Sequence, residues 1–357
     1  MKKSNLFLDV HAIQTLPPSN INRDDTGSPK TAQYGGVRRA RVSSQAWKKA
    51  MRDYFKENSE SLNVGVRTLN IVDYLARKIR EIDSSISYEE AMKLAEKTIN
   101  DAGVKTANQK AKALFFLGNT QAERLAKASL EKEDKKVLKD ILKENPAIDI
   151  ALFGRMVADD SNLNEEASSQ VAHAISTHPI DQEFDFYTAI DDFSNDQSNV
   201  GAGMLGTIEF NSSTLYRYAN VAVHDLFKQL KDKKATINTL QLFVEAFVKS
   251  LPTGKVNTFA NQTLPQLVLV TLREDRPVNL VSAFEKPVRS TDGYVEKSIE
   301  KLFDEYYKVE KFTQKPIFAS YVTTENTKSD IKEEESLTKL LEGLKTEIDE
   351  KLEEDGE

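Results

Sequence analysis

The sequence predicts an α+β fold in which a ferredoxin-like sheet carries a large helical insertion. Two observations lead to this prediction. Strand patterning occurs at residues 5–13 and again between residues 147 and 272, whereas residues 60–145 have the spacing of amphipathic helices. The order strand, helix, helical block, strands, helix, strand fits a split βαβ unit with insertions. We therefore expect the strands at residues 5–13 and 266–272 to lie in one sheet.

The N-terminal part of the chain passes from a strand through turns to a helix. Residues 5–13 alternate well enough to form a strand with one better-buried face. The dipeptide Pro17-Pro18 and a group of glycines up to Gly36 then predict a long loop. Ser43 supplies an N-cap, so we expect a helix from there to about residue 57.

The middle of the chain is predicted to be helical and then rich in strands. Apolar residues of the helical block recur on shared faces, with Lys and Glu between them. These residues are Leu75, Ile79, Ile82, Met92, Ala95 and Ile99. Strands are predicted at residues 148–157, 170–180, 184–190, 207–210, 215–223 and 266–272, a helix at 236–249 and a polar loop at 191–206.

The composition excludes several classes of protein. Of the 357 residues, 39% are hydrophobic and 29% are charged, which is typical of a soluble globular chain. There is no apolar run near the ~18 residues that a membrane span needs, and no signal-peptide pattern. The chain has no cysteine, which excludes disulfides and thiolate metal sites. We expect a cytoplasmic protein without a membrane partner.

The net charge of −7 is unevenly distributed along the chain. Residues 330–357 hold 12 acidic residues and 4 lysines, so the remainder is close to neutral. Within that remainder, residues 34–52 hold six arginines and lysines and no acidic residue. Because local charge density controls the attraction of polyanions within a Debye length, this segment predicts a cationic patch.

The acidic tail also carries an apolar stripe at helical spacing. The stripe consists of Leu337, Leu340, Leu341, Leu344, Ile348 and Leu352. It fits two interpretations, docking onto the protein's own core or contact with a neighbouring subunit. We favour the first, because most such stripes face a core.

The helix after Ser43 separates apolar from basic side chains. Its apolar side includes Trp47 and Met51 and is expected to face the sheet. Its N-terminus offers free N–H groups and a positive dipole end beside Gln45. An ordinary solvated face is the alternative, but such faces interleave acids and this one has only Asp53. We therefore favour phosphate binding. The cations on this face and on the preceding strand are Arg39, Arg41, Lys48, Lys49, Arg52 and Lys56.

Motifs typical of enzymes and cofactor sites lack the context that they need. Residues 201–206 match G-x-G-x-x-G, but a polar loop precedes them and a strand-like segment follows. The pairs Asp24-Asp25 and Asp191-Asp192 could hold a divalent metal, although such pairs are more often turn residues. The four histidines form no metal-ligand set. We predict no catalytic residue, metal site or cofactor.

Several long motifs in register resemble a known family. Residues 22–25 (Asn-Arg-Asp-Asp) and 35–45 (Gly-Gly, Arg-Arg and Ser-Ser-Gln) closely resemble the opening of the CasC family, the backbone subunits of the type I-E CRISPR Cascade surveillance complex. Residues 172–178, 205–220 and 279–286 resemble this family too. The resemblance extends roughly from residue 5 to residue 310.

The resemblance implies the shape of a right hand, with an RNA-recognition-motif-like palm, helical fingers and a thumb hairpin loop. In this family, copies stack into a filament along guide RNA (crRNA), which then pairs with target DNA in antiviral defence. The implied partners are guide RNA, target DNA through the guide, further copies of the chain and other Cascade subunits. By position, the palm would comprise residues 1–59, 181–190 and 214–329, the fingers 60–180, the thumb 191–213 and the tail helix 330–357.

The resemblance also implies site residues. RNA phosphates would be held by Ser43, Gln45, Lys48, Lys49 and Arg52, with Arg23 near a kink in the RNA; the charge pattern adds Arg39 and Arg41. The thumb tip would be formed by Gly203, Met204, Leu205 and Thr207. We expect a non-catalytic protein. The alternatives are a metal-dependent ribonuclease of the related type III kind, using Asp24 or Asp25, and self-assembly through the tail without RNA.

Overall fold

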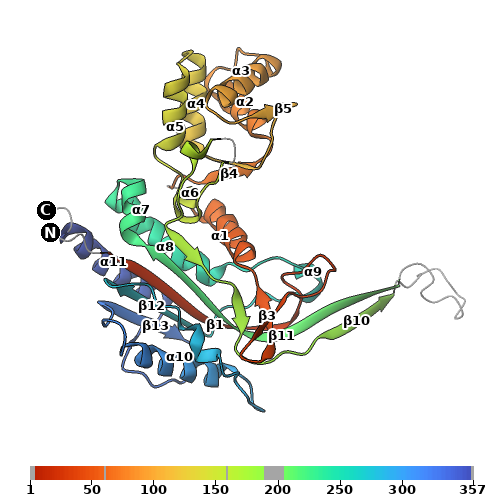
Figure 1. Cartoon of the computed structure of the whole chain (residues 1–357), viewed down its shortest axis with the longest axis vertical. Coiled ribbons are helices and arrows are strands. Elements are labelled where there is room, and N and C mark those ends of the chain that lie inside the picture. The colour runs from red at the N-terminus through yellow and green to blue at the C-terminus, as the bar shows by residue number, and fades with distance from the viewer. Residues whose placement is uncertain (1–4, 60–61, 158–159, 189–204, 355–357) are drawn as a thin grey trace, which may run out of the picture.

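The computed structural model describes residues 5–59, 62–157, 160–188 and 205–354. Within these ranges the chain has a mixed α+β architecture, with eleven helices and a large, mostly antiparallel sheet (Figure 1). The strands of this sheet are, in spatial order, β14 (Lys332–Glu333), β13 (Phe318–Thr323), β12 (Leu267–Arg273), β1 (Phe7–Ser19), β11 (Leu205–Ala222), β9 (Ala174–Ser176), β3 (Val37–Val42) and β2 (Thr31–Tyr34), with β8 (Ser169–Val171) and β10 (Glu183–Thr188) also pairing with β11.

Strand β1 lies in the middle of this sheet. It pairs antiparallel with β11 on one side and with β12 on the other, so that Val10 lies opposite both Ala219 and Val270. The predicted sharing of one sheet by the first strand and residues 266–272 is therefore confirmed.

The two faces of the sheet pack against different helices, because side chains alternate along each strand. Leu8, Val10 and Ala12 of β1 belong to one core, and Ile13 belongs to the other. The helices of the first core are α1 (Ser44–Asn58), α6 (Ile148–Phe153), α7 (Val223–Leu230), α8 (Lys233–Lys249) and α11 (Leu337–Glu354). Those of the second are α10 (Val295–Val309) and the short 3-10 helix η2 (Leu280–Phe284).

A third core lies in the helical lobe, which we define as residues 65–147. Figure 1 shows this lobe standing above the sheet, next to α1 and α6. Its buried side chains, including Leu75, Ile79 and Leu125, pack on one another. The lobe is mainly helical, as predicted, but Ile82, expected on a buried face, is 52% exposed. The elements of the lobe are β4 (Gly65–Thr68), α2 (Ile71–Ile82), α3 (Tyr88–Asp101), β5 (Thr106–Ala107), β6 (Lys110–Ala111), β7 (Phe115–Gly118), α4 (Asn119–Leu130) and α5 (Lys135–Lys143).

The segment that follows the lobe differs from its prediction. Residues 148–157 were expected to form a strand, but they begin with helix α6 (Ile148–Phe153) and are followed by the short 3-10 helix η1 (Ser161–Leu163). Five consecutive residues of α6 are buried. A short apolar run that is buried on all sides has no period that distinguishes a strand from a helix, so its sequence could not decide between them.

Three other boundaries differ as well. Strand β1 continues through Pro17-Pro18, where a loop was expected, and its register with β11 shifts between Leu16 and Ser19. Proline is tolerated at such an irregularity because it does not need to donate a ladder hydrogen bond. The strand predicted at 170–180 is divided into β8 and β9, and the two predicted from 207 to 223 are one strand, β11.

The acidic tail docks on the protein's own core, as we favoured. In α11, Leu340, Leu344 and Ile348 are fully buried and belong to the core shared with α8. Full burial of one such side chain contributes about 1.5–3 kcal/mol, so the stripe holds the tail firmly against the body.

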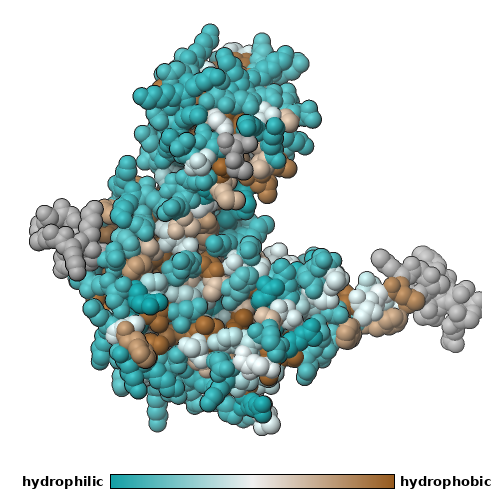
Figure 2. Space-filling view, viewed as in Figure 1, coloured by the Kyte–Doolittle hydropathy of each residue, from teal (hydrophilic) through white to brown (hydrophobic). Residues whose placement is uncertain are grey.

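Strands β10 and β11 form a ribbon that projects from the sheet, which we call the arm (residues 183–188 and 205–210; Figure 1). On one face of the arm, Phe184, Phe186 and Leu205 are 63%, 67% and 69% exposed. Figure 2 shows apolar residues gathered at the outer end of the described part of the arm. At its base, Phe210 packs against Phe259 of α9 (Val256–Phe259).

Candidate nucleic-acid interface

Helix α1 is positioned by its N-cap and by its apolar face. The Ser43 hydroxyl accepts a hydrogen bond from the Ala46 N–H at 3.3 Å, and the Ser43 N–H donates to Asn22 Oδ1 at 2.8 Å. Trp47 and Met51 are almost completely buried in the first core. The predicted capped, amphipathic helix is therefore confirmed, and its opposite side is available to line a cleft.

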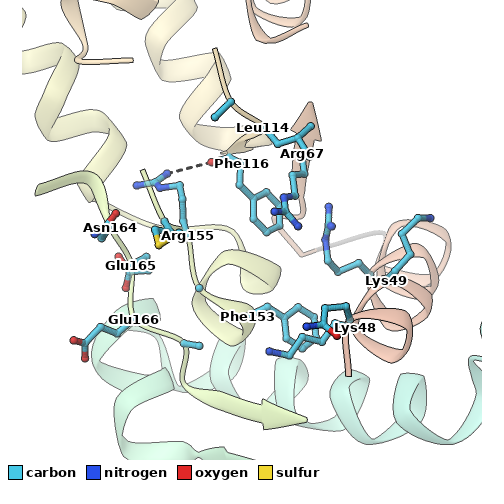
Figure 3. Close-up of a pocket in the computed structure, with 16 residues that line it drawn as sticks. Lys48, Lys49, Arg67, Leu114, Phe116, Phe153, Arg155, Asn164, Glu165 and Glu166 are labelled. Atoms are coloured by element: carbon cyan, nitrogen blue, oxygen red, sulfur yellow. Dashed lines mark hydrogen bonds between the residues drawn. The ribbon is translucent and has the colours of Figure 1, made fainter. Parts of the chain in front are cut away.

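A cleft of about 910 Å³ lies between α1 and the helical lobe. Figure 3 shows Lys48 of α1 on one side of it and Arg67 of β4 and Phe116 of β7 on the other, with Lys49 of α1 at its edge. The cleft is lined by five basic and two acidic side chains, so it favours an anionic ligand. These side chains are Lys48, Lys49, Arg52, Arg67 and Arg155, and Glu165 and Glu166.

The two lysines of α1 are held differently. Lys48 Nζ lies 5.7 Å from the centre of the Phe153 ring, and burial lowers the pKa of Lys48. The negative face of the ring attracts the ammonium group without neutralising it. The Lys49 side chain is 70% exposed and pairs with Asp53 one turn along the helix. Lys48 is therefore the lysine fixed at the cleft wall.

Arg52 lies deeper in the cleft wall than the lysines. Its guanidinium group lies 4.4 Å from the centre of the Phe116 ring, and its Nε lies 3.6 Å from Asp149 Oδ2. Burial lowers the pKa of Arg52 and raises the pKa of Asp149 to about 6, although the Gly65 N–H and Arg52 both stabilise the Asp149 carboxylate. Arg52, which was predicted to lie on an exposed face of the helix, is therefore partly enclosed.

Arg155 belongs to the wall of the cleft rather than to its open surface. It is 5% exposed, and its guanidinium group donates to the carbonyl oxygens of Leu163 and Leu142 at 2.9 and 2.7 Å. The Glu165 carboxylate on the rim accepts a hydrogen bond from Gln229. Lys48, Lys49, Arg52 and Arg67 remain as the basic groups that a ligand can reach.

Arg39 lies inside the protein, contrary to the expectation from the charge pattern. It is 0% exposed, and it donates hydrogen bonds to the carbonyl oxygens of Tyr34, Ser176 and Phe284. Its guanidinium group is therefore occupied by the backbone, and we remove Arg39 from the set of expected RNA contacts. A neighbouring glycine explains the close packing, since a Cβ on Gly35 would lie 1.7 Å from a backbone oxygen of the segment after η2.

Not all predicted residues converge on the cleft. Gln45 lines it together with the α1 cations. Ser43 is 5% exposed and its hydroxyl serves as the helix cap. Arg41 donates from Nε to the Thr31 carbonyl at 3.1 Å and approaches His173, outside the cleft. Arg23 is exposed and forms a β-bridge with Pro29, also outside the cleft.

The predicted thumb tip is only partly within the described residues. Gly203 and Met204 lie outside them. Leu205 and Thr207 lie on β11 in the arm, where both are exposed. The G-x-G-x-x-G match ends at Gly206, which also lies in β11, so a strand follows the motif where a nucleotide site would need a helix.

The acidic pair at Asp24-Asp25 lies in an exposed turn. Asp24 Oδ1 accepts hydrogen bonds from the N–H groups of Thr26 and Ser28 and from the Thr26 hydroxyl. These bonds lower the pKa of Asp24 and are those of an Asx turn. Among the described residues, no group of three or more His, Cys, Asp or Glu is arranged to hold a metal ion.

Sequence reasoning missed several residues of the cleft and of the wall behind it. Arg67 lies on a short strand inside a block predicted to be helical, and Phe116 lies on its partner strand. Phe153 and Asp149 belong to the helix that was predicted as a strand. Each lies at the cleft or in its wall only through the packing of the lobe against α1, which no local pattern in the sequence reveals.

Comparison with known proteins identifies the family. The profile of the family described as CT1975-like protein matches residues 8–346. The chain belongs to this family, the CasC type of Cascade backbone subunits. Two similar solved chains come from structures described as "CRISPR RNA-guided surveillance complex, pre-nicking" and "CRISPR RNA-guided surveillance complex". The resemblance seen in the sequence motifs is therefore confirmed.

Both similar chains extend over nearly the whole molecule. The first is 30% identical, with a TM-score of 0.83, over 96% of this chain and 100% of that chain. The second is 27% identical, with a TM-score of 0.71, over 96% and 99%. No curated protein matches the chain significantly. None of the helices described is long and apolar enough to cross a membrane.

Proposed function

We propose that this CasC-type chain is a non-catalytic, cytoplasmic subunit of a type I-E Cascade complex that binds guide RNA by its phosphate backbone. It oligomerises along the RNA and, with the other Cascade subunits, presents it for pairing with target DNA. The observation that carries this proposal is the cleft beside α1, where basic side chains from two cores face one space.

The chemistry of the cleft suits a phosphate backbone. Lys48 and Arg52 are held by aromatic rings, and Arg67 approaches from the opposite wall, so successive phosphates meet positive charge on both sides. Gln45 adds an uncharged amide near the helix N-terminus. Such contacts fix the register of RNA without reading its sequence, which then belongs to base pairing.

The proposal also assigns the parts of the hand. The central sheet with its flanking helices would be the ferredoxin-like, RNA-recognition-motif-like palm, and residues 191–213 the thumb. Residues 60–180 would be the fingers, apart from β8 and β9, which lie in the central sheet. The arm supports the thumb assignment, because Leu205 exposes apolar surface there, on the same face as Phe184 and Phe186 of the adjoining palm strand. An apolar face on a projecting ribbon is suited to contact RNA bases or a neighbouring copy.

The salt dependence of RNA binding tests whether the basic side chains of the cleft bind RNA phosphates. For the purified chain and a fluorescent single-stranded RNA, the logarithm of the association constant should fall linearly with the logarithm of salt concentration. Lys48→Ala should flatten the slope by about 0.7, one single-strand contact, and weaken all RNA sequences alike. Lys56→Ala is the matched control, since Lys56 is exposed on the same helix but does not line the cleft. An unchanged slope in Lys48→Ala contradicts the proposal.

The same preparation distinguishes the non-catalytic proposal from the ribonuclease alternative. Labelled RNA incubated with and without magnesium should remain intact if the subunit is non-catalytic. A magnesium-dependent cut that disappears in Asp25→Ala would favour the enzyme instead.

A further inference from the structure

The lobe and the body meet in a small enclosed seam behind the cleft. Four elements contribute to it: Arg52 from α1, Asp149 from α6, Gly65 from β4 and Phe116 from β7. The approach is close, since a Cβ on Gly65 would lie 2.8 Å from the Phe116 ring and 3.2 Å from Asp149 Oδ1. The seam therefore requires glycine at this position and leaves the arginine and aspartate facing each other.

The two charged groups are unequally enclosed. The Asp149 side chain is 0% exposed, whereas that of Arg52 is 12% exposed and lines the cleft. Asp149 Oδ1 accepts the Gly65 N–H at 2.8 Å, and Oδ2 faces Arg52 Nε at 3.6 Å. That distance is longer than a hydrogen bond, and both Oδ2 and Nε are buried without a hydrogen-bond partner. The pair is thus held by charge and by packing.

The terminal nitrogens of Arg52 differ from its Nε. No carbonyl or carboxylate in the described part of the chain accepts a hydrogen bond from them, and they are not among its buried unpaired atoms. The Phe116 ring at 4.4 Å limits the rotation of the guanidinium plane. One edge of the group is therefore anchored in the seam, and the other edge is available to an anion in the cleft.

We propose that Asp149 is a positioning residue for RNA binding: its buried carboxylate holds Arg52 so that the terminal guanidinium nitrogens face a phosphate in the cleft. This inference rests on the proposed function and adds to it a residue that touches no RNA. A guanidinium group oriented before binding loses less side-chain entropy when it meets a phosphate, which makes each contact stronger.

The direction in which Asp149→Asn changes RNA affinity distinguishes positioning of Arg52 from simple neutralisation of its charge. Asp149→Asn keeps the side-chain volume and an oxygen for the Gly65 N–H, but removes the charge opposite Arg52. If Asp149 positions Arg52, binding of a short single-stranded RNA should weaken about tenfold, the scale of one charge-assisted contact. If Asp149 merely offsets the charge of Arg52, its removal should tighten binding, and that result would overturn the proposal.

A matched control removes the carboxylate of a similar aspartate–arginine pair in the sheet. Asp9 is also 0% exposed, its Oδ2 lies 3.6 Å from the Nε of Arg273, and a backbone N–H donates to it. It lies in the sheet and does not line the cleft. Asp9→Asn should reduce stability while leaving RNA affinity within about twofold. A tenfold loss in this control as well would mean that Asp149→Asn acts only through general destabilisation, which contradicts the inference.

Double substitution completes the test. In an Arg52→Gln background, Asp149→Asn should cause no further weakening, because the residue through which it acts is absent. An additional loss would overturn positioning. This comparison also serves if Asp149→Asn alone folds poorly, because the double variant contains no unpaired buried charge and the affinity of Arg52→Gln is measured on its folded fraction. If Arg52→Gln itself leaves RNA binding unchanged, the proposed contact of Arg52 with RNA fails rather than its positioning by Asp149.

Discussion

Two aspartate–arginine pairs in this molecule have nearly the same internal geometry and different surroundings. In both, the arginine Nε lies 3.6 Å from a carboxylate that is 0% exposed, and a backbone N–H donates to the same carboxylate. In the sheet, Arg273 is 2% exposed and also donates to the Gln314 carbonyl at 2.9 Å. At the seam, Arg52 is 12% exposed on the cleft side. One pair is closed by protein on all sides, and the other is open on one side.

Enclosure distinguishes the arginines that are bonded within the fold from Arg52, which a ligand in the cleft can reach. Arg39, Arg155, Arg217 and Arg273 are each 5% exposed or less, and each donates to at least one backbone carbonyl. Burying a cation is costly unless its donors are bonded, and each of these four groups has at least one donor bonded inside the protein. The Arg52 side chain is 12% exposed, and no carbonyl in the described part of the chain accepts a hydrogen bond from it, so its terminal nitrogens can donate to a ligand.

Breaking the closed pair should reduce the stability of the protein more than any other change considered below. Above pH 7, where Asp9 is mostly ionised in the folded wild-type protein, Arg273→Met leaves Asp9 buried without its counter-charge, and it should lower the free energy of unfolding by about 3–5 kcal/mol in urea denaturation. RNA affinity of the folded fraction should not change, because neither Asp9 nor Arg273 lines the cleft. A loss below about 1 kcal/mol would show that the closed pair does not have the structural role inferred from its burial.

The second effect concerns pH and the same closed pair. Burial raises the pKa of Asp9 from 3.8 to about 7, although Tyr218, the Val278 N–H and Arg273 all stabilise its carboxylate. The folded protein therefore keeps this proton up to about pH 7, whereas the unfolded chain releases it near pH 3.8. The stability that comes from this group is complete at low pH and is lost as pH rises to about 7.

Asp9→Asn removes this dependence and so isolates it. Between pH 5 and pH 7, the stability of the wild-type chain relative to Asp9→Asn should fall by roughly 2 kcal/mol, since one pKa unit corresponds to about 1.4 kcal/mol. The contribution of Asp149, whose pKa is raised to about 6, cancels in this difference because both proteins contain it. Urea denaturation at four pH values measures the difference, and a relative stability that rises with pH would contradict the assignment.

Much of the fold followed from local patterns, and the exceptions share a cause. The alternation in β1 and the cap at Ser43 are local signals, and both elements formed where predicted. The prediction for the α6 segment was wrong because Ile150 and Leu152 are buried in a helix whose neighbours cover every side, so no polar face marks the helical period. The loop predicted at Pro17-Pro18 was wrong because a register shift against the partner strand, which no local pattern reveals, accommodates the two prolines within β1.

The site was predictable as a charged helix but not as a cleft. Periodicity placed Lys48, Lys49 and Arg52 on one side of α1, and all three line the same space. Charge patterns cannot tell whether an arginine meets a phosphate or a backbone carbonyl, so Arg39 was misplaced. Arg67 reaches the cleft only because the lobe folds back over α1, which depends on contacts distant in sequence.

The smallest expected effect extends the comparison to a pair that is open to solvent. The Lys49 and Asp53 side chains are 70% and 45% exposed and pair across one turn of α1. Such i,i+4 pairs are screened by water and salt, so Lys49→Ala should change the free energy of unfolding by no more than about 0.5 kcal/mol. In the RNA assay, Lys49→Ala should flatten the salt slope less than Lys48→Ala does, because Asp53 competes with phosphate for the Lys49 ammonium group. Removing that competitor with Asp53→Asn should strengthen RNA binding slightly and steepen the salt slope.

The three pairs would then form a series in which enclosure determines the effect of a substitution. The closed pair affects stability alone, the half-open pair affects RNA binding through the orientation of Arg52, and the exposed pair affects only the local charge. Equal slopes for Lys48→Ala and Lys49→Ala would break this series, because enclosure would then make no difference to how a basic side chain meets RNA.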